Sequence, residues 1–460
     1  MGVVTRYDAI VVGAGVAGLA AAVRLAGRGA RVLVLEARSR LGGRATSFSD
    51  RETGEIVDNG QHVLLGAYRD TFAFLEVIGA GDGARLAPRL DVTMVDRAGQ
   101  ASRLSCPDLP PPLHLIAGVF DWDAVSWADR LAVLRMARPL RLARRELEPG
   151  AREIAASPGE TVENWLIRNG QTPRLRELLW EPLALAALNQ PASHAAAPPF
   201  ARVLAEMFGP DPRAAAVAVP SKPLHLLFGE GARAFIEQRG GAVRTGSPAV
   251  VTIGPGEGRA GGPAVRTVGS GADEWTAPAV VSAVPWFSVG SLFAGDVAAL
   301  APTIARAGRM ASSPILTVNL WFDRPLFEEA FVGLPGRKMQ WVFDKRKAFG
   351  DVASHLCLVS SGASDAARLP QDELVAVACR ELADAFPAAR EARLLRGTVI
   401  REPHATFSLA PGQPARPGVV TEVAGLYLAG DWIATGLPAT IESAVRSGHQ
   451  AADIIAGGRP

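Results

Sequence analysis

Three glycines near the start of the chain have the spacing of a dinucleotide-binding turn. Gly13, Gly15 and Gly18 stand at GxGxxG spacing, after an apolar run that reads as a strand and before an Ala-rich run that reads as a helix. In such a turn the backbone at Gly15 comes close to a pyrophosphate. The N–H groups of the first helical residues, Val16 and Ala17, then face the phosphates.

An acid follows this turn at the distance that ribose recognition needs. Glu36 ends a second apolar run, residues 31–35, about 20 residues after the glycines. A carboxylate at the end of this strand can accept hydrogen bonds from ribose hydroxyls. The turn, its flanking elements and the acid together predict a nucleotide site that includes Glu36 and the neighbouring Ala37.

The next motif separates flavin from nicotinamide cofactors, which share the first one. Gly42, Gly43 and Arg44 follow Glu36 after a short interval. The two glycines allow a second close approach of backbone to phosphate, and the guanidinium of Arg44 can neutralise the phosphate charge. This Glu-(six residues)-Gly-Gly-Arg pattern favours FAD.

The far end of the chain supplies what reads as the other half of the same site. Gly430 and Asp431 end a short apolar run, which places a carboxylate where it can bind a ribitol hydroxyl. A helix start follows at Ala439, Thr440 and Ile441, and we expect Pro438, the residue before them, near its first turn. The N-terminus of this helix would stabilise negative charge on the pyrimidine ring of a reduced flavin.

These motifs need a particular arrangement of elements around them. A chain of 460 residues can form two domains. The pattern predicts an α/β fold with a discontinuous Rossmann-type FAD/NAD(P)-binding domain and an inserted α+β substrate domain of amine-oxidase-like architecture. The segment between about residues 122 and 207 is mostly helical in pattern. The expected FAD-binding segments are 1–85, 220–290 and 410–460, and the expected substrate-domain segments are 86–219 and 291–409.

Composition excludes several other classes of protein. The net charge of +2 argues against nucleic-acid binding. The three cysteines are far apart and the seven histidines lack ligand spacing, so neither disulfides nor a metal site is predicted. No signal peptide and no membrane-spanning run is found, which favours a cytoplasmic protein, at most peripheral on the inner face of a membrane. Nearly all basic residues are arginine, and the lysines are Lys222, Lys338, Lys345 and Lys347.

The cofactor motifs resemble those of the flavin amine oxidase and phytoene desaturase superfamily. The segment 239–244, Arg-Gly-Gly-Ala-Val-Arg, with Val250 after it, belongs to that resemblance, as does the Gly-Asp ending. Residues 58–68 and 179–189 are similar to a narrower branch, the hydroxysqualene dehydroxylases of bacterial squalene and hopanoid synthesis. Residues 220–231 depart from the Gly-Gly-Met loop typical of phytoene desaturases, which counts against a carotenoid desaturase.

The resemblance implies a reductive reaction on a C30 isoprenoid, hydroxysqualene. Reduced FAD would deliver hydride to the carbon that bears an allylic hydroxyl, and water would leave. Hydroxide is a poor leaving group, so an acid must protonate it. In relatives the loop with Gly60, Gln61 and His62 approaches the flavin, so His62 is one candidate for this acid. Glu181 is the second, because an apolar surrounding would raise its pKa. Weaker candidates are Asn189 and His404, and Asp58 is interpreted as structural.

The remaining expectations concern partners. A long hydrocarbon suits the apolar helical segment, whose large side chains would line either a tunnel or a core. Residues 130–145 read as an amphipathic helix, with Val133, Met136, Leu140 and Ala143 on one side and arginines on the other, so peripheral membrane contact is one interpretation and a solvated arginine face the other. No second GxGxxG is present, so the electron donor would be free NAD(P)H, ferredoxin or flavodoxin.

Two other functions stay open at this point. One is an oxidative flavoenzyme, either an isoprenoid desaturase or an amine oxidase. Amine oxidation is disfavoured because an aromatic cage would be expected and the chain has only three tyrosines. The other is a non-enzymatic scaffold or isoprenoid-binding partner that FAD stabilises.

Overall fold

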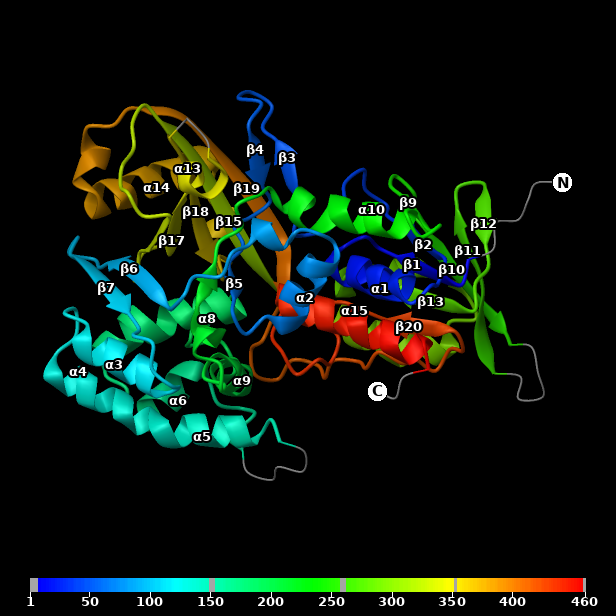
Figure 1. The fold of residues 1–460 in the computed structure, drawn as a ribbon, viewed down its shortest axis with the longest axis horizontal. Coiled ribbons are helices and arrows are strands. Elements are labelled where there is room, and N and C mark those ends of the chain that lie inside the picture. The colour runs from blue at the N-terminus through cyan, green and yellow to red at the C-terminus, as the bar shows by residue number, and fades with distance from the viewer. Residues whose placement is uncertain (1–6, 149–153, 257–261, 351–353, 458–460) are drawn as a thin grey trace.

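A computed structural model of the chain describes residues 7–148, 154–256, 262–350 and 354–457. Figure 1 shows two sheets and a helical region arranged around the middle of the molecule. The parallel sheet with α1 and α15 lies on the right, the larger antiparallel sheet at the upper left, and the helices α3 to α6 at the lower left.

The first sheet has five parallel strands in the order β20-β13-β1-β2-β9. Its strands are β1 (Ala9–Val12), β2 (Val32–Leu35), β9 (Ala242–Arg244), β13 (Ala279–Ser282) and β20 (Leu426–Leu428). The first two and β13 are buried along their whole length, as strands covered on both faces must be. The helices α1 (Val16–Gly27) and α15 (Ile441–Ile455) pack against each other, and α10 (Gly231–Glu237) packs on α1.

This sheet confirms the predicted α/β fold class. Its strands come from the start, the middle and the end of the chain, in agreement with a discontinuous domain. The exact domain limits given above remain a prediction. Pro438 lies two residues before the N-cap of the last helix, near its first turn. That helix begins at Ile441, and Thr440 caps it by accepting a hydrogen bond from the N–H of Ser443 at 3.1 Å.

A four-stranded sheet lies beside the first, in the order β12-β11-β10-β14. Its strands are β10 (Val250–Pro255), β11 (Pro263–Ser270), β12 (Asp273–Trp275) and β14 (Phe293–Gly295). The apolar run 249–253 predicts a strand and the Gly-rich segment 254–262 predicts a hairpin loop. The strand is β10, which pairs antiparallel with β11. Residues 257–261 of the predicted loop lie outside the described residues.

The second large sheet has seven strands in the order β19-β15-β18-β17-β16-β6-β7. They are β6 (Asp91–Val95), β7 (Ala101–Ser105), β15 (Ser312–Phe322), β16 (Phe331–Gly333), β17 (Trp341–Asp344), β18 (Ser354–Ser361) and β19 (Leu394–Phe407). Leu316, Val318 and Leu320 alternate along β15 and form one apolar core with α14 (Gln371–Ala385). Thr317 and Asn319 therefore point to the opposite face.

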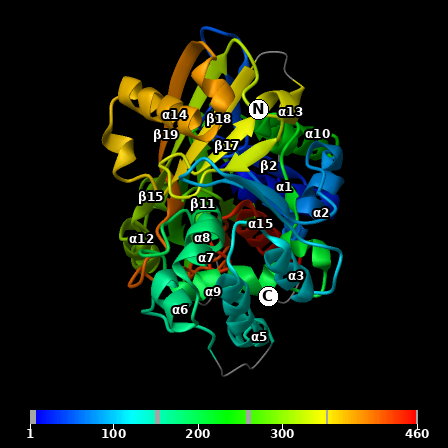
Figure 2. The same ribbon diagram turned by 90° about the vertical axis from the view of Figure 1, so that its left-hand side faces the viewer.

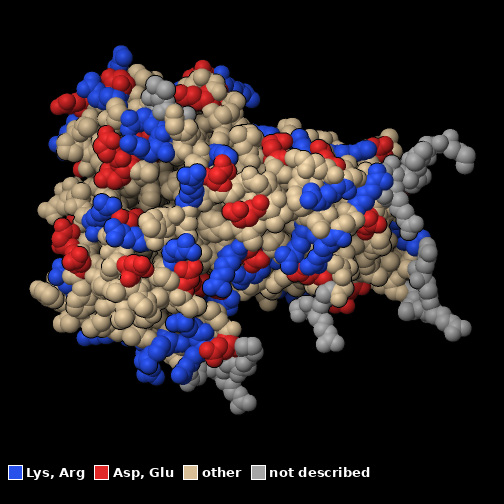
Figure 3. Space-filling model, in the orientation of Figure 1, with Lys and Arg blue, Asp and Glu red and all other residues tan. Residues whose placement is uncertain are grey.

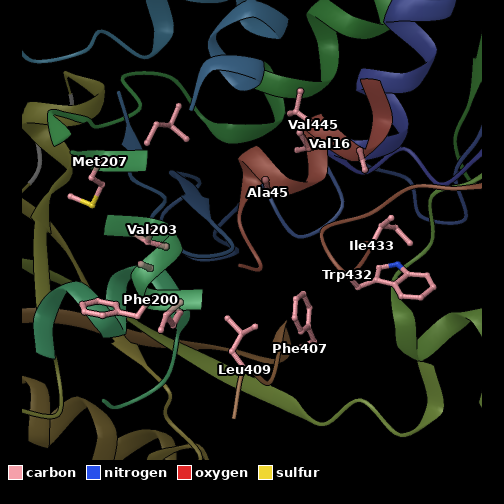
Figure 4. Packing of buried hydrophobic residues seen from close by; sticks show 14 of the residues in the cluster. Val16, Ala45, Phe200, Val203, Met207, Phe407, Leu409, Trp432, Ile433 and Val445 are labelled. Atoms are coloured by element: carbon pink, nitrogen blue, oxygen red, sulfur yellow. The ribbon is translucent and has the colours of Figure 1, made fainter. Parts of the chain in front are cut away.

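The helical region lies below the five-stranded and seven-stranded sheets in the view of Figure 2. Its helices are α3 (Leu113–Asp121), α4 (Trp127–Val133), α5 (Ala137–Arg145), α6 (Val162–Arg168), α7 (Pro173–Leu175), α8 (Glu181–Leu188) and α9 (Ala197–Met207), with a 3-10 turn at Leu134–Met136 and a π-helical turn at Arg176–Trp180. One apolar core joins this region to the cofactor domain. Figure 4 shows it running from Phe200 on α9 through Phe407 to Trp432.

The shorter elements connect these layers. They are β3 (Ser47–Ser49), β4 (Ile56–Asp58), β5 (Leu64–Leu65), β8 (Val217–Ala218), α2 (Arg69–Val77), α11 (Val289–Leu292), α12 (Ala301–Gly308) and α13 (Lys345–Phe349). In the described parts of the chain, no helix is both long and apolar enough to cross a membrane.

Candidate functional site

The two glycine loops near the N-terminus lie against each other. The N–H of Gly42 donates to the carbonyl of Ala14 at 2.9 Å, and a Cβ on Gly43 would come within 3.0 Å of the Cα of Gly15. At Gly18 a Cβ would fall 1.9 Å from the carbonyl oxygen of Gly13. Glycine is therefore required at both contacts, and two strips of bare backbone face one region at the start of α1.

Glu36 points into the same region. Its carboxylate accepts the backbone N–H of Ala14 at 2.8 Å and that of Arg38 at 2.8 Å, which fixes both oxygens at the edge of the glycine turn. The side chain is buried, with 8% of its surface exposed. The exposed Ala37 follows it directly.

Arg44 joins the two ends of the chain. Its guanidinium donates to both carboxylate oxygens of Asp431, at 2.6 and 3.0 Å, and to the carbonyl of Ala405 at 2.9 Å. The same guanidinium lies over the ring of Trp286, 5.3 Å from its centroid. The Gly-Gly-Arg motif and the Gly-Asp motif, 387 residues apart, thus form one ion pair.

The start of α15 holds the Gly430–Asp431 turn in place. The Ser443 hydroxyl donates to the carbonyl of Asp431 at 3.0 Å, and the Gly430 N–H donates to the Ser447 hydroxyl at 2.8 Å. Ala439, Thr440 and Ile441 precede or begin this helix and are all partly exposed. The first N–H groups of a helix have no partner within it, so this end can receive an acceptor group.

A buried ion pair supports the loop that carries His62. Lys345, on α13, donates to Asp58 at 3.0 Å and to the side-chain oxygen of Gln61 at 2.7 Å. Both members of the Lys345–Asp58 pair have only 1% of their side-chain surface exposed. Asp58 also accepts the Ser47 hydroxyl at 2.6 Å and the Leu224 N–H at 3.2 Å. Asp58 is structural, as interpreted from the sequence, and its lysine partner was not predicted.

The hydrogen bonds of His62 define its protonation state. Its Nδ1 lies 2.8 Å from the carbonyl oxygen of Gly60, so Nδ1 carries the proton. Burial lowers the pKa of His62; the Gly60 carbonyl and the Asp58 charge raise it in part, and the charges of Arg44 and Lys345 lower it. The neutral ring therefore has an unprotonated Nε2. The Gln61 side chain donates to the His62 carbonyl at 3.1 Å and completes the link to Lys345.

Asn59 ties this loop to the cofactor motifs. Its side-chain amide donates to the carbonyl of Arg44 at 3.3 Å and to the carboxylate of Glu402 at 3.0 Å. On the other side of the loop, a Cβ on Gly60 would lie 3.5 Å from the Thr317 hydroxyl. The structure thus brings the 58–62 loop together with Arg44 and Asp431.

An apolar wall begins at the residue after His62. Phe343, Cys357 and Val359 form a small buried core on the face of the seven-stranded sheet opposite α14. Partly buried apolar side chains pack against it from this sheet and from two neighbouring segments: Val63, Val219, Ile315, Phe331 and Trp341. Large apolar side chains that stay partly uncovered next to a site are available to an apolar ligand.

The structure places Glu181 elsewhere. This residue begins α8, and its carboxylate accepts the backbone N–H of Ala192 at 3.0 Å. Burial raises the pKa of Glu181, Glu163 raises it further, and the Ala192 N–H lowers it. These partners all belong to the helical region, and none of the contacts described for Glu181 joins it to the His62 loop.

Three other predicted residues have clear positions. Val250 is the first residue of β10 and is 44% exposed. Buried Asn189 has a left-handed backbone and bonds to Ser313, Thr406 and Gly362, which ties α8 to the seven-stranded sheet. His404 pairs with the Ser312 hydroxyl at 2.7 Å and stacks on Phe287.

These residues fit FAD. The backbone at Gly15 and Gly43 suits a pyrophosphate, and Glu36 suits a ribose. The buried hydroxyls of Thr46 and Thr317 lie beside the Arg44 and Gly60 loops and have no hydrogen-bond partner within the described structure. Buried hydroxyls of this kind normally bind something, and the polar atoms of a flavin and its ribitol would satisfy them.

Sequence reasoning missed three residues of the site: Lys345, Thr317 and Asn59. One available signal was the rarity of lysine: only four occur beside many arginines, and Lys345 is one of them. For Thr317, the apolar run 315–322 predicts a strand, and its alternation indicates the face on which Thr317 lies but not what that face contacts.

Comparison with known proteins agrees with this geometry. The sequence matches the family "Flavin containing amine oxidoreductase" over residues 16–456. It is 33% identical to the hydroxysqualene dehydroxylase of Rhodopseudomonas palustris, over 98% of each chain. It is 26% identical to the 15-cis-phytoene desaturase of an Oncidium hybrid cultivar, over 97% of this chain and 77% of the relative. In fold it is similar to a putrescine oxidase solved with putrescine, with a TM-score of 0.70 and 21% identity over 98% of this chain and 99% of the other.

Proposed function

Because this chain belongs to the flavin containing amine oxidoreductases, and is therefore an FAD-dependent oxidoreductase, we propose that it converts hydroxysqualene to squalene. The reaction replaces the allylic hydroxyl with hydrogen and releases water. The sequence similarity to the Rhodopseudomonas palustris hydroxysqualene dehydroxylase, which spans nearly the whole of both chains, supports this substrate.

The observation that carries the proposal is the apolar wall next to the His62 loop. Phe331 and Trp341 are in ring contact, with centroids 6.1 Å apart, and both are only partly buried. Val63, the residue after His62, packs against the same small core as these two rings. A surface of this kind suits a long hydrocarbon, and it would exclude the water that could otherwise capture an allylic cation.

The chemistry divides between cofactor and protein. FAD, when bound and reduced, supplies hydride to the carbon that bears the hydroxyl. The protein must protonate the leaving oxygen, since hydroxide leaves poorly. We assign this proton to Nε2 of His62, because Nδ1 is committed to the Gly60 carbonyl. Glu181 is the alternative donor, and we rank it second because its hydrogen bonds stay within the helical region.

This assignment has a consequence for pH. Burial keeps the pKa of His62 below its ordinary value of 6.5, so the donor form with a proton on Nε2 is the minor form at neutral pH. Proton delivery would therefore become faster as the pH falls. In this scheme Lys345 and Asp58 hold the loop that carries His62.

Oxidative desaturation of an isoprenoid is the second candidate, favoured by the similarity to phytoene desaturase. Anaerobic single-turnover assays separate the possibilities. We expect photoreduced holoenzyme mixed with hydroxysqualene to form squalene in proportion to its reduced flavin, while the absorption of oxidised flavin returns. The oxidised enzyme should form none. Reduction of the oxidised enzyme by phytoene or by an amine such as putrescine, without squalene formation in the first assay, would refute the proposal.

A further inference from the structure

The outer surface of α3 and α4 is apolar. On α3, Leu113 is 53% exposed, and Ile116 and Phe120 follow it at helical spacing with partly exposed side chains. On α4 and the turn after it, Trp127 is 68% exposed, Leu131 58% and Leu134 41%. The two stripes touch, because Phe120 and Trp127 are in edge-to-face contact with ring centroids 6.4 Å apart. A surface helix of a globular protein normally turns such residues inward.

The same helical stripe changes from apolar to basic along its length. The residues where α4, the 3-10 turn and α5 meet all have right-handed helical backbones, so the chain continues helically. Spacings of four, three and three continue the stripe from Leu134 to Arg138, Arg141 and Arg144, and all three arginines are exposed. Residues 130–145 contain six arginines and no acid. Figure 3 shows this part of the surface at the lower left, nearly free of charge over α3 and α4 and basic over α5.

The structure also corrects the sequence-based interpretation of this segment. The predicted apolar side, Val133, Met136, Leu140 and Ala143, is buried in the protein core and cannot meet a membrane. The exposed apolar residues are a different set. The predicted arginine face does reach solvent at Arg138 and Arg141.

We propose that this face, Leu113, Trp127, Leu131 and Leu134 with Arg138, Arg141 and Arg144, docks the protein on an anionic lipid surface. Tryptophan and leucine side chains enter the boundary between headgroups and acyl chains, and arginines pair with lipid phosphates. The charge pattern favours this occupant, since an apolar protein partner would not need the adjoining run of arginines. The docking adds to the proposed function a place of substrate uptake, because a C30 isoprenoid partitions into membranes.

The position of the patch agrees with this role. Asp123, in the turn between α3 and α4, lines a groove of about 590 Å³ on the protein surface. Phe331 lines the same groove and also packs on the apolar wall beside the His62 loop. The groove thus extends from the turn between α3 and α4 to one side chain that packs on the apolar wall.

Vesicle sedimentation of the purified holoenzyme, without substrate, tests the docking. Two vesicle types are needed, phosphatidylcholine alone and phosphatidylcholine with phosphatidylglycerol. We expect binding to the anionic vesicles that weakens with salt. The triple variant Trp127→Ser, Leu131→Ser, Leu134→Ser should bind at least tenfold more weakly. The triple variant Arg138→Gln, Arg141→Gln, Arg144→Gln should lose the preference for anionic lipid.

The matched control removes equally exposed apolar side chains elsewhere: Val77→Ser, Leu395→Ser and Val420→Ser, which are 52%, 55% and 60% exposed. It should bind vesicles like the wild type. All variants should keep their FAD content and should convert detergent-dispersed hydroxysqualene at the wild-type rate, so failure of docking is separable from failure of the proposed reaction. Absence of vesicle binding by the wild type, binding of both patch variants that equals that of the wild type, or a wild-type dimer that the first variant dissociates would overturn the proposal.

Discussion

Two ion pairs hold the candidate site together, and they differ in solvent exposure and in the segments that they join. Arg44–Asp431 joins the two ends of the cofactor domain, and Arg44 keeps 27% of its side-chain surface exposed. Lys345–Asp58 joins the His62 loop to the second sheet, and both partners are 1% exposed. The first pair consists of groups that a bound cofactor can also use. The second has no access to solvent, so its role is to fix a loop. The part of the site around Arg44–Asp431 therefore binds the cofactor, and the part around Lys345–Asp58 positions the loop that carries His62. We call them the binding half and the positioning half.

The largest effect on the reaction rate should come from substitution of His62, in the loop that Lys345 and Asp58 hold. We expect His62→Ala to slow squalene formation by about 10²–10⁴-fold, because the leaving hydroxyl loses its acid. FAD content and photoreduction should be unchanged. The wild-type rate should rise as the pH falls toward the lowered pKa of His62, and the variant should lack this rise. Rapid-quench rates across pH measure both. Loss of FAD together with activity would reassign His62 to cofactor binding.

The next effect tests the buried pair itself. Lys345→Met leaves the Asp58 carboxylate buried without its charged partner, and we expect a loss of about 3–5 kcal/mol in unfolding free energy. Adding Asp58→Asn to that variant should restore part of the loss. Arg44→Met, the matched change in a pair whose arginine is 27% exposed and whose carboxylate is 7% exposed, should cost less, about 1–3 kcal/mol. Urea denaturation of the three variants measures this. Equal losses for Lys345→Met and Arg44→Met would remove the distinction between the two halves.

Substitutions in the binding half should change the affinity for FAD rather than the unfolding free energy. Glu36→Ala removes the carboxylate at the edge of the glycine turn, and we expect FAD binding to weaken by about 1–3 kcal/mol. Titration of the apoprotein with FAD measures the change. Unchanged affinity and full occupancy in the purified variant would remove Glu36 from the cofactor site.

The two halves of the site also differ in how well the sequence predicts them. The glycine turns and Glu36 are predictable because each requirement is local: a backbone approach, a turn and an acid at the end of a strand. The role of Lys345 is not predictable, because its partner Asp58 lies 287 residues away and no local sequence feature near either residue indicates the pair. The helical segment gives an intermediate case. Its periodicity located an amphipathic run, but only the tertiary packing determines which apolar side is covered.

The smallest effect concerns His355, a buried residue on the sheet behind the loop. Its ring bonds to Asn319 at 2.9 Å and stacks on Trp321, and burial lowers its pKa to about 3 from 6.5. The unfolded chain binds this proton first, so folding stability is lost as the pH falls below 6.5. We expect about 1 kcal/mol per pH unit from this group. His355→Gln should flatten the pH dependence of unfolding by that amount, and parallel curves for the two proteins would contradict it.

Deuterium transfer tests the proposed reaction most directly. Hydrogen on reduced flavin exchanges with solvent, whereas hydride on the carbon of a nicotinamide does not. We predict that photoreduced enzyme, turned over once with hydroxysqualene in D₂O, yields squalene with one deuterium at the former carbinol carbon. Squalene without deuterium at that carbon, or no squalene from fully reduced holoenzyme, would contradict the account.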